Sequence, residues 1–107
     1  MKFESLALNK KILDAITAQG YTSPSPIQQK AIPAILDGKD VMAAAQTGTG
    51  KTAGFTLPIL ERLLAGKAAA PNKIRALIIT PTRELAIQVS ESVSTYGTNT
   101  TLTSAVV

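Results

Sequence analysis

The sequence contains no cysteine, no histidine and no tryptophan, and aromatic residues make up only 4% of its 107 residues. These absences exclude disulfides, metal sites built on thiolate or imidazole ligands, and catalysis by a cysteine or histidine side chain. Because 45% of the residues are nevertheless hydrophobic, a core must be mainly aliphatic, and the composition is not that of a disordered chain. At this length we expect one domain or part of one.

Long apolar runs and blocks of charge are also missing. No stretch approaches the roughly 20 apolar residues of a membrane span, and the opening residues MKFESLALNKK lack the pattern of a signal peptide. Eleven basic and seven acidic residues give a net charge of +4, spread evenly over the two halves of the chain. Such a balance permits an anionic partner without requiring one. Because the sequence shows neither a membrane span nor a signal peptide, we expect a cytoplasmic protein.

Capping residues and apolar spacing predict four helices. Asn9 suits the N-cap of the first helix. The segment Ser25-Pro26-Ile27-Gln28 combines an N-cap serine, a proline at the first helical position and a glutamine three residues after the cap. Pro81-Thr82 opens the last helix, in which apolar residues recur at every fourth position. The expected helices span residues 10–19, 26–36, 50–64 and 82–97.

Three apolar segments outside these helices predict strands. Residues 40–44 and 75–79 have the pattern of short buried strands, and residues 100–107 that of a third. Strands that alternate with helices are typical of a parallel sheet with helices on its faces. We therefore expect an α/β fold, truncated after about three strands because the sequence stops within an apolar run.

The segment AQTGTGKT, residues 45–52, lies between a predicted strand and a predicted helix. Phosphate binding by such a loop needs inward-pointing backbone N–H groups, a lysine for charge and a hydroxyl for Mg²⁺. Gly48 and Gly50 let the backbone approach the phosphates closely. Lys51 can reach the β- and γ-phosphates, Thr52 can bind Mg²⁺, and the helix N-terminus adds positive partial charge. The pattern predicts a P-loop nucleotide site, with a glycine-rich turn and a capping threonine as the alternative.

The loop alone does not choose between adenine and guanine. Upstream, the side-chain amide of Gln28 can donate and accept at once, as the N6 and N7 positions of adenine require. Tyr21 could stack on the base. On spacing alone, however, a capping role for Gln28 and a core position for Tyr21 are the stronger alternative.

Three segments resemble motifs of the DEAD-box RNA helicases, in the order that this family uses. GYTSPSPIQ, residues 20–28, is similar to the Q motif, and Phe3 lies seventeen residues before Gly20, where the family places an isolated aromatic. AQTGTGKT is similar to motif I, whose common form begins with alanine, and PTRELA, residues 81–86, is similar to motif Ia. KTAGFTLPIL after the loop is closest to the bacterial RhlE-like subgroup.

The resemblance implies that residues 1–107 are the N-terminal part of the first RecA-like domain, a P-loop NTPase fold with a parallel sheet and flanking helices. Residues 1–29 would be the Q-motif region, and residues 40–107 the start of the ATP-binding core. The family's DEAD tetrapeptide, SAT motif and second RecA-like domain are absent from the sequence, and none of its seven acidic residues follows a predicted buried strand.

The resemblance also implies roles for individual residues. Gln28 would read adenine, with Tyr21 packed on the base and Phe3 nearby, and Thr52 would bind Mg²⁺. Lys51 and Thr52 would be the catalytic residues. The loop residues that would surround ATP are Ala45, Gln46, Thr47, Gly48, Thr49, Gly50, Lys51 and Thr52. The residues that would contact the RNA sugar-phosphate, without regard to base sequence, are Pro81, Thr82 and Arg83.

Two positions qualify these implied roles. Many relatives carry a basic residue against the base where this chain has Ser23, so adenine would be held slightly less firmly. For Thr82 and Arg83 the alternative is a helix cap followed by an exposed charge. An arginine there opposes the helix dipole unless an anion lies close, which favours a phosphate partner.

The resemblance therefore implies an ATP-dependent RNA helicase that unwinds or remodels RNA duplexes with ATP hydrolysis. We expect the 107 residues alone to bind ATP or ADP without turnover, because the residues that complete the site are missing. The alternative is a truncated, non-catalytic module that binds adenine nucleotides. The uncharged segment 92–107 further predicts self-association through exposed sheet edges.

Overall fold

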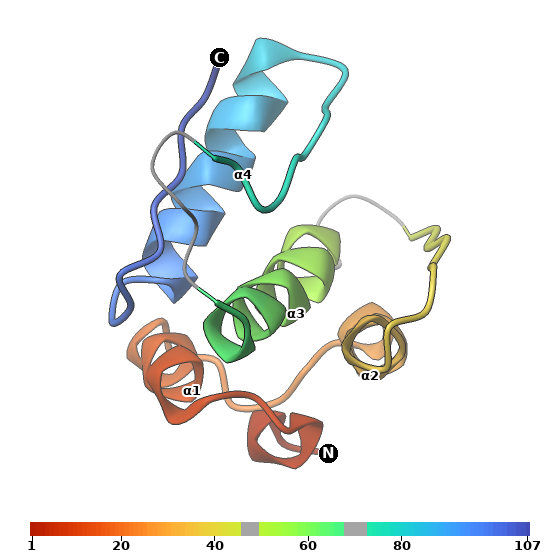
Figure 1. Ribbon diagram of the computed structural model, residues 1–107. Coiled ribbons are helices and arrows are strands. Elements are labelled where there is room, and N and C mark those ends of the chain that lie inside the picture. Colours follow the sequence, from red (N-terminus) through yellow and green to blue (C-terminus); the bar gives the residue numbers. More distant parts are fainter. Residues whose placement is uncertain (46–49, 68–72) are drawn as a thin grey trace.

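The computed structural model describes residues 1–45, 50–67 and 73–107. Figure 1 shows α3 in the middle of these residues, with the other helices around it. In the described part of the chain, no helix has both the length and the apolar character needed to cross a membrane. The elements are the 3₁₀ helix η1 (Phe3–Leu6) and the α-helices α1 (Lys10–Ala18), α2 (Pro26–Leu36), α3 (Lys51–Ala65) and α4 (Arg83–Tyr96).

The helices begin at the capping residues that the sequence predicts. The Asn9 side chain accepts a hydrogen bond from the Lys11 backbone N–H at 2.9 Å. At the start of α2, Ser25 and Gln28 form both hydrogen bonds of a capping box. The Thr82 hydroxyl accepts from the Leu85 N–H at 3.1 Å and caps α4. The four predicted helices are confirmed to within one residue at each end. The 3₁₀ helix η1 was not predicted.

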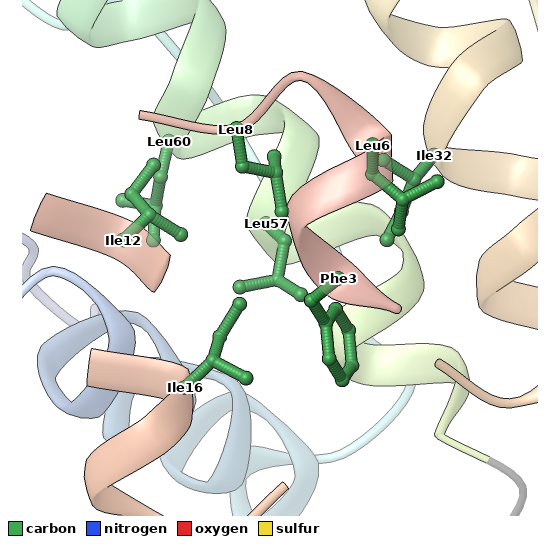
Figure 2. Packing of buried hydrophobic residues seen from close by; sticks show 8 residues of the cluster. All are labelled: Phe3, Leu6, Leu8, Ile12, Ile16, Ile32, Leu57 and Leu60. Carbon is green, nitrogen blue, oxygen red and sulfur yellow. The ribbon is translucent and has the colours of Figure 1, made fainter. Parts of the chain in front are cut away.

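The core is built by helices and by the N-terminal segment (Figure 2). Side chains from η1, α1, α2 and α3 meet in one cluster, which is aliphatic apart from one phenylalanine, as the composition predicts. On α1 and α3 the buried pairs lie about one turn apart, so each helix presents a single apolar face. The cluster consists of Phe3, Leu6, Leu8, Ile12, Ile16, Ile32, Leu57 and Leu60.

The predicted parallel sheet is wrong for this structure. Residues 40–44, 75–79 and 100–107 contain no strand, and none of the described residues belongs to one. Side chains predicted to be buried are instead exposed: Met42 is 100% exposed, Leu77 73% and Ile79 84%.

The physical reason lies in what an apolar pattern reports. A run such as RALIIT signals a preference for burial and for extended backbone. A strand also needs a neighbouring backbone to accept and donate its ladder hydrogen bonds. Among the described residues, no backbone hydrogen bonds join the three apolar segments to one another. The helices, which satisfy their own backbone groups, form without that requirement.

The last segment illustrates the difference. After α4 the chain turns at Gly97–Thr100 and runs back beside the helix (Figure 1). Ser104 lies 3.3 Å from Ser90 of α4, oxygen to oxygen, so the segment packs on a helix where a third strand was predicted. Without a sheet in the described residues, there are no sheet edges of the predicted kind. Self-association of the chain stays a prediction.

Substituting alanine should lower stability strongly in the helical core and hardly at all in an exposed apolar segment. Ile12→Ala removes a fully buried side chain and should lower the free energy of unfolding by about 2–5 kcal/mol. Leu77→Ala removes an exposed one and should change it by about 0.5 kcal/mol or less. Urea unfolding followed by circular dichroism measures both. A loss for Leu77→Ala as large as that for Ile12→Ala would show that this segment is buried in solution.

Candidate functional site

One hollow of about 620 Å³ brings together predicted residues from distant parts of the sequence. Phe3, Tyr21 and Gln28 line it from the N-terminal half, and Gly50 and Thr52 line it from the end of the P-loop motif and the start of α3. Its volume falls within the range of pockets that hold small organic ligands, roughly 300–1,000 Å³. The predicted base-binding residues therefore share one pocket with two residues of the predicted phosphate site, Gly50 and Thr52.

Gln28 is the side chain that ties the two halves of this pocket together. Its Oε1 accepts a hydrogen bond from the Ser25 N–H at 2.9 Å, and its Nε2 donates to the Gly50 carbonyl at 3.1 Å. The amide orientation is fixed by these partners, because a backbone N–H needs an acceptor and a carbonyl needs a donor. Gln28 is only 8% exposed, so these hydrogen bonds are shielded from water.

The two bonds do not exhaust the amide of Gln28. A carboxamide has two N–H donors and two oxygen lone pairs. Among the described residues, one donor and one lone pair of Gln28 therefore have no protein partner, on a side chain that lines the hollow. Of the two alternatives for this residue, a helix cap or a base reader, the structure realises the first and leaves the groups required for the second.

Gly50 occupies a position that only glycine fits well. Its φ of 86° lies in the left-handed region, which side chains with a Cβ adopt at a cost. A Cβ at Gly50 would collide with the amide nitrogen of Gln28 and lie 3.2 Å from the Ser25 hydroxyl. Because Gly50 is also the N-cap of α3, no cap side chain occupies the first N–H groups of that helix. They form a place for anionic groups.

The remaining residues of the predicted loop are distributed differently. Thr52 lines the hollow, whereas Lys51 is the exposed first residue of α3 and is not part of the lining. Ala45 lines a second, smaller hollow of about 230 Å³ beside Pro26 and Lys30. The predicted binding residues Gln46, Thr47, Gly48 and Thr49 lie outside the described residues.

The two aromatic residues predicted near the base have different surroundings. Phe3 is 5% exposed and belongs to the core cluster, while one side of it reaches the hollow. Tyr21 is 55% exposed, so the alternative that placed it in the core is wrong. Its backbone N–H donates to the Ile16 carbonyl at 3.4 Å, which fixes it just after α1. Ser23 also lines the hollow.

The predicted RNA-contacting residues lie apart from this hollow. Pro81, Thr82 and Arg83 are exposed at the N-terminus of α4, and none of them is among the residues that line the pocket. The Thr80 hydroxyl donates to the Thr82 carbonyl at 2.8 Å and, with the Thr82 cap, orders the approach to the helix. The structure thus separates this segment from the pocket.

Three residues that line the pocket from α4 were not predicted from the sequence. They are Gln88, Ser92 and Tyr96, each four positions after the last. Such spacing places side chains on one face of a helix, but their polarity is that of a solvated face. Burial raises the pKa of the Tyr96 phenol above its ordinary value, and the nearby Tyr21 phenol adds to the rise.

Comparison with known proteins identifies the family. The family model described as DEAD/DEAH box helicase matches residues 25–107. The chain belongs to this family. The DEAD-box ATP-dependent RNA helicase RhpA of Helicobacter pylori is 52% identical over 98 residues, which are 92% of this chain and 19% of that protein. The ATP-dependent RNA helicase DRS1 of Eremothecium gossypii is 56% identical over 89 residues, which are 83% of this chain and 12% of that protein.

Two solved structures are similar to this chain. The RNA helicase Prp28 from Chaetomium thermophilum, determined bound to ADP, gives a TM-score of 0.83 at 36% identity over 95% of this chain and 25% of that one. A DEAD box protein from Methanococcus jannaschii gives a TM-score of 0.79 at 42% identity, over 90% of this chain and 25% of that one. The chain spans about a fifth or less of the length of RhpA and DRS1.

Adding a methyl group at Gly50 should test how far this site depends on Gln28. Gly50→Ala should destabilise the protein more than Gly38→Ala, by about the 1–2 kcal/mol of displaced hydrogen bonds. Both glycines have a φ above 80°, but a Cβ at Gly38 has no neighbour within 4 Å. The control Gly38→Ala therefore introduces the strain of a left-handed backbone without a steric collision. Equal losses in urea unfolding would mean that Gln28 moves aside freely and does not hold Gly50.

Proposed function

We propose that the chain binds an adenine nucleotide with Mg²⁺, as the start of the ATP-binding domain of an ATP-dependent RNA helicase. One observation carries the proposal: Phe3, Tyr21 and Gln28 line the same hollow as Gly50 and Thr52. The names of the relatives, ATP-dependent RNA helicases, and the ADP of the similar Prp28 structure support the choice of nucleotide.

Gln28 is the residue that selects adenine in this proposal. Adenine presents an N6–H donor beside the N7 acceptor, whereas guanine presents two acceptors, O6 and N7. The amide's remaining donor and acceptor match the first pattern. Tyr21 and Phe3 supply aromatic surface beside the base. In domain terms, residues 1–29 form the base-binding region and residues 40–107 the start of the ATP-binding core.

The phosphates occupy the start of α3 in this proposal. The uncapped N–H groups of the helix and its positive dipole end favour an anion there. Lys51, exposed at the first helical position, supplies a flexible positive charge, and Thr52, which lines the hollow, supplies a hydroxyl. The hydroxyl of Thr52 would hold Mg²⁺, which would neutralise phosphate charge. Residues 45–50 complete the loop.

We also assign RNA contact to Pro81, Thr82 and Arg83. All three are exposed at the N-terminus of α4, where N–H groups and a cation together suit a phosphate. Arg83 faces an unfavourable helix dipole unless such an anion is present. Contacts of this kind position a nucleic acid without reading its bases. The proposed RNA interaction is therefore independent of sequence.

The choice of base gives the first test of the function. ADP should bind roughly 10-fold more tightly than GDP, because a matched pair of hydrogen bonds is worth about 1–2 kcal/mol. Thermal shift and isothermal titration with both nucleotides measure the difference. Gln28→Ala should remove the preference.

The control for this test lies on the same helix. Gln29 donates to the Pro24 carbonyl at 3.0 Å and does not line the hollow. Gln29→Ala removes a comparable hydrogen bond and should retain the preference for ADP. Equal binding of ADP and GDP to the unaltered protein would rule out adenine reading.

A polypeptide of these 107 residues should bind ADP and yet not hydrolyse ATP. Phosphoryl transfer needs an acid that holds Mg²⁺, an oriented water and an arginine that alone contributes about 10³–10⁵ in rate. The sequence lacks the DEAD tetrapeptide, to which the family resemblance assigns this acid. Phosphate release would be measured with and without RNA, beside Lys51→Ala. Release that RNA stimulates and that Lys51→Ala abolishes would contradict this expectation.

A further inference from the structure

Helix α4 presents three polar side chains to the nucleotide hollow. Gln88, Ser92 and Tyr96 all line it, at intervals of four residues. We call these three residues the α4 stripe. A helix turns once in 3.6 residues, so the stripe follows one face over about two turns. None of its members belongs to the residues assigned so far to base, phosphate or RNA.

The position of the stripe is fixed by contacts of α4 with other helices. Tyr96 packs against the core cluster. The side chain of Asn99, just after the helix, donates to the Lys11 carbonyl of α1 at 3.1 Å. Gly97 is buried, and a Cβ on it would lie 3.5 Å from the Leu60 side chain of α3. The C-terminal end of α4 is therefore seated against both α1 and α3.

The chemistry of the stripe points to the nucleoside end of the ligand. Tyr96 lines the same hollow as Tyr21 and Phe3, which places it with the base-binding residues. An aromatic ring suits a base, and an amide and two hydroxyls suit the hydroxyl groups of a ribose. The stripe has no cation, so it offers phosphates little.

We propose that the α4 stripe is a second wall of the nucleotide pocket. In this proposal its side chains contact the base and ribose, and the ring of Tyr96 lies against the base. The inference rests on the proposed adenine-nucleotide function and adds residues to the same site. It makes the part of α4 from Gln88 to Tyr96 belong to the nucleotide site, although the helix begins at the proposed RNA-contacting segment.

A bulky side chain on the stripe should block the pocket. Ser92→Phe places a ring into the hollow, whereas Ser94→Phe places the same ring on the exposed side of the same helix. By isothermal titration, Ser92→Phe should weaken ADP binding at least 10-fold, and Ser94→Phe should leave it within about 2-fold. Circular dichroism melts establish that both variants fold.

A second measurement avoids substitutions within the stripe. The chain has two tyrosines and no tryptophan, so in Tyr21→Phe the intrinsic fluorescence comes from Tyr96 alone. Adenosine and ADP should both change this emission on binding, and inorganic pyrophosphate should not. If the Tyr96 fluorescence does not change when adenosine and ADP bind, the inference is overturned, even if Ser92→Phe fails to fold.

The possible outcomes separate this inference from the function on which it rests. ADP binding that is lost in Lys51→Ala but equal in Ser92→Phe and Ser94→Phe would leave the nucleotide site standing and refute the second wall. Failure of the unaltered protein to bind ADP would refute both. ADP binding that is lost in Ser92→Phe but kept in Ser94→Phe, together with a Tyr96 fluorescence change on binding adenosine, would support the second wall.

Discussion

The carboxamide of Gln28 is the interaction on which the candidate site depends. It closes the capping box at the start of α2 and, with its other end, holds the Gly50 carbonyl at the start of α3. Gln28 and Gly50 lie 22 positions apart in the sequence. One side chain thus fixes the position of the predicted phosphate-binding helix relative to the predicted base-binding segment. The bond is feasible only because Gly50 lacks a Cβ, which would occupy the place of the amide nitrogen.

The helical core supports this arrangement from beneath. Leu57 belongs both to the core cluster and to the lining of the hollow, and so does Phe3. The floor of the pocket is therefore the surface of the core, and close packing there limits how far either helix can shift. The polar groups that face a ligand come from the starts of α2 and α3, from the connection between α1 and α2, and from one face of α4. Rigid helices thus position groups that would be mobile on a loop alone.

The sequence predicts local features of this molecule well and its long-range pairing poorly. Asn9, Ser25 and Thr82 signal their helix starts through short-range hydrogen bonds that do not depend on the rest of the chain. Leu77 and Ile79 signal burial, but whether they are buried depends on which backbone lies beside them, and no local pattern contains that information. For the site, motif resemblance brought together Phe3, Tyr21, Gln28 and the loop. It could not supply Tyr96, because a polar stripe on a helix has the same pattern whether it faces water or a pocket.

The geometry of α4 gives the two proposed binding surfaces a common support. Thr82 caps the helix at one end, and Tyr96 lines the nucleotide hollow at the other. At 1.5 Å per residue, the 14 residues of α4 separate the two ends by about 21 Å. A helix of this length moves nearly as a rigid body, so a ligand that tilts or shifts one end also moves the other. Given both proposed sites, any such displacement would couple RNA and nucleotide affinity, and by thermodynamic linkage the coupling free energy would be the same in both directions. The hydrogen bond of Asn99 to α1 and the packing of Tyr96 on the core cluster set the resistance to that movement.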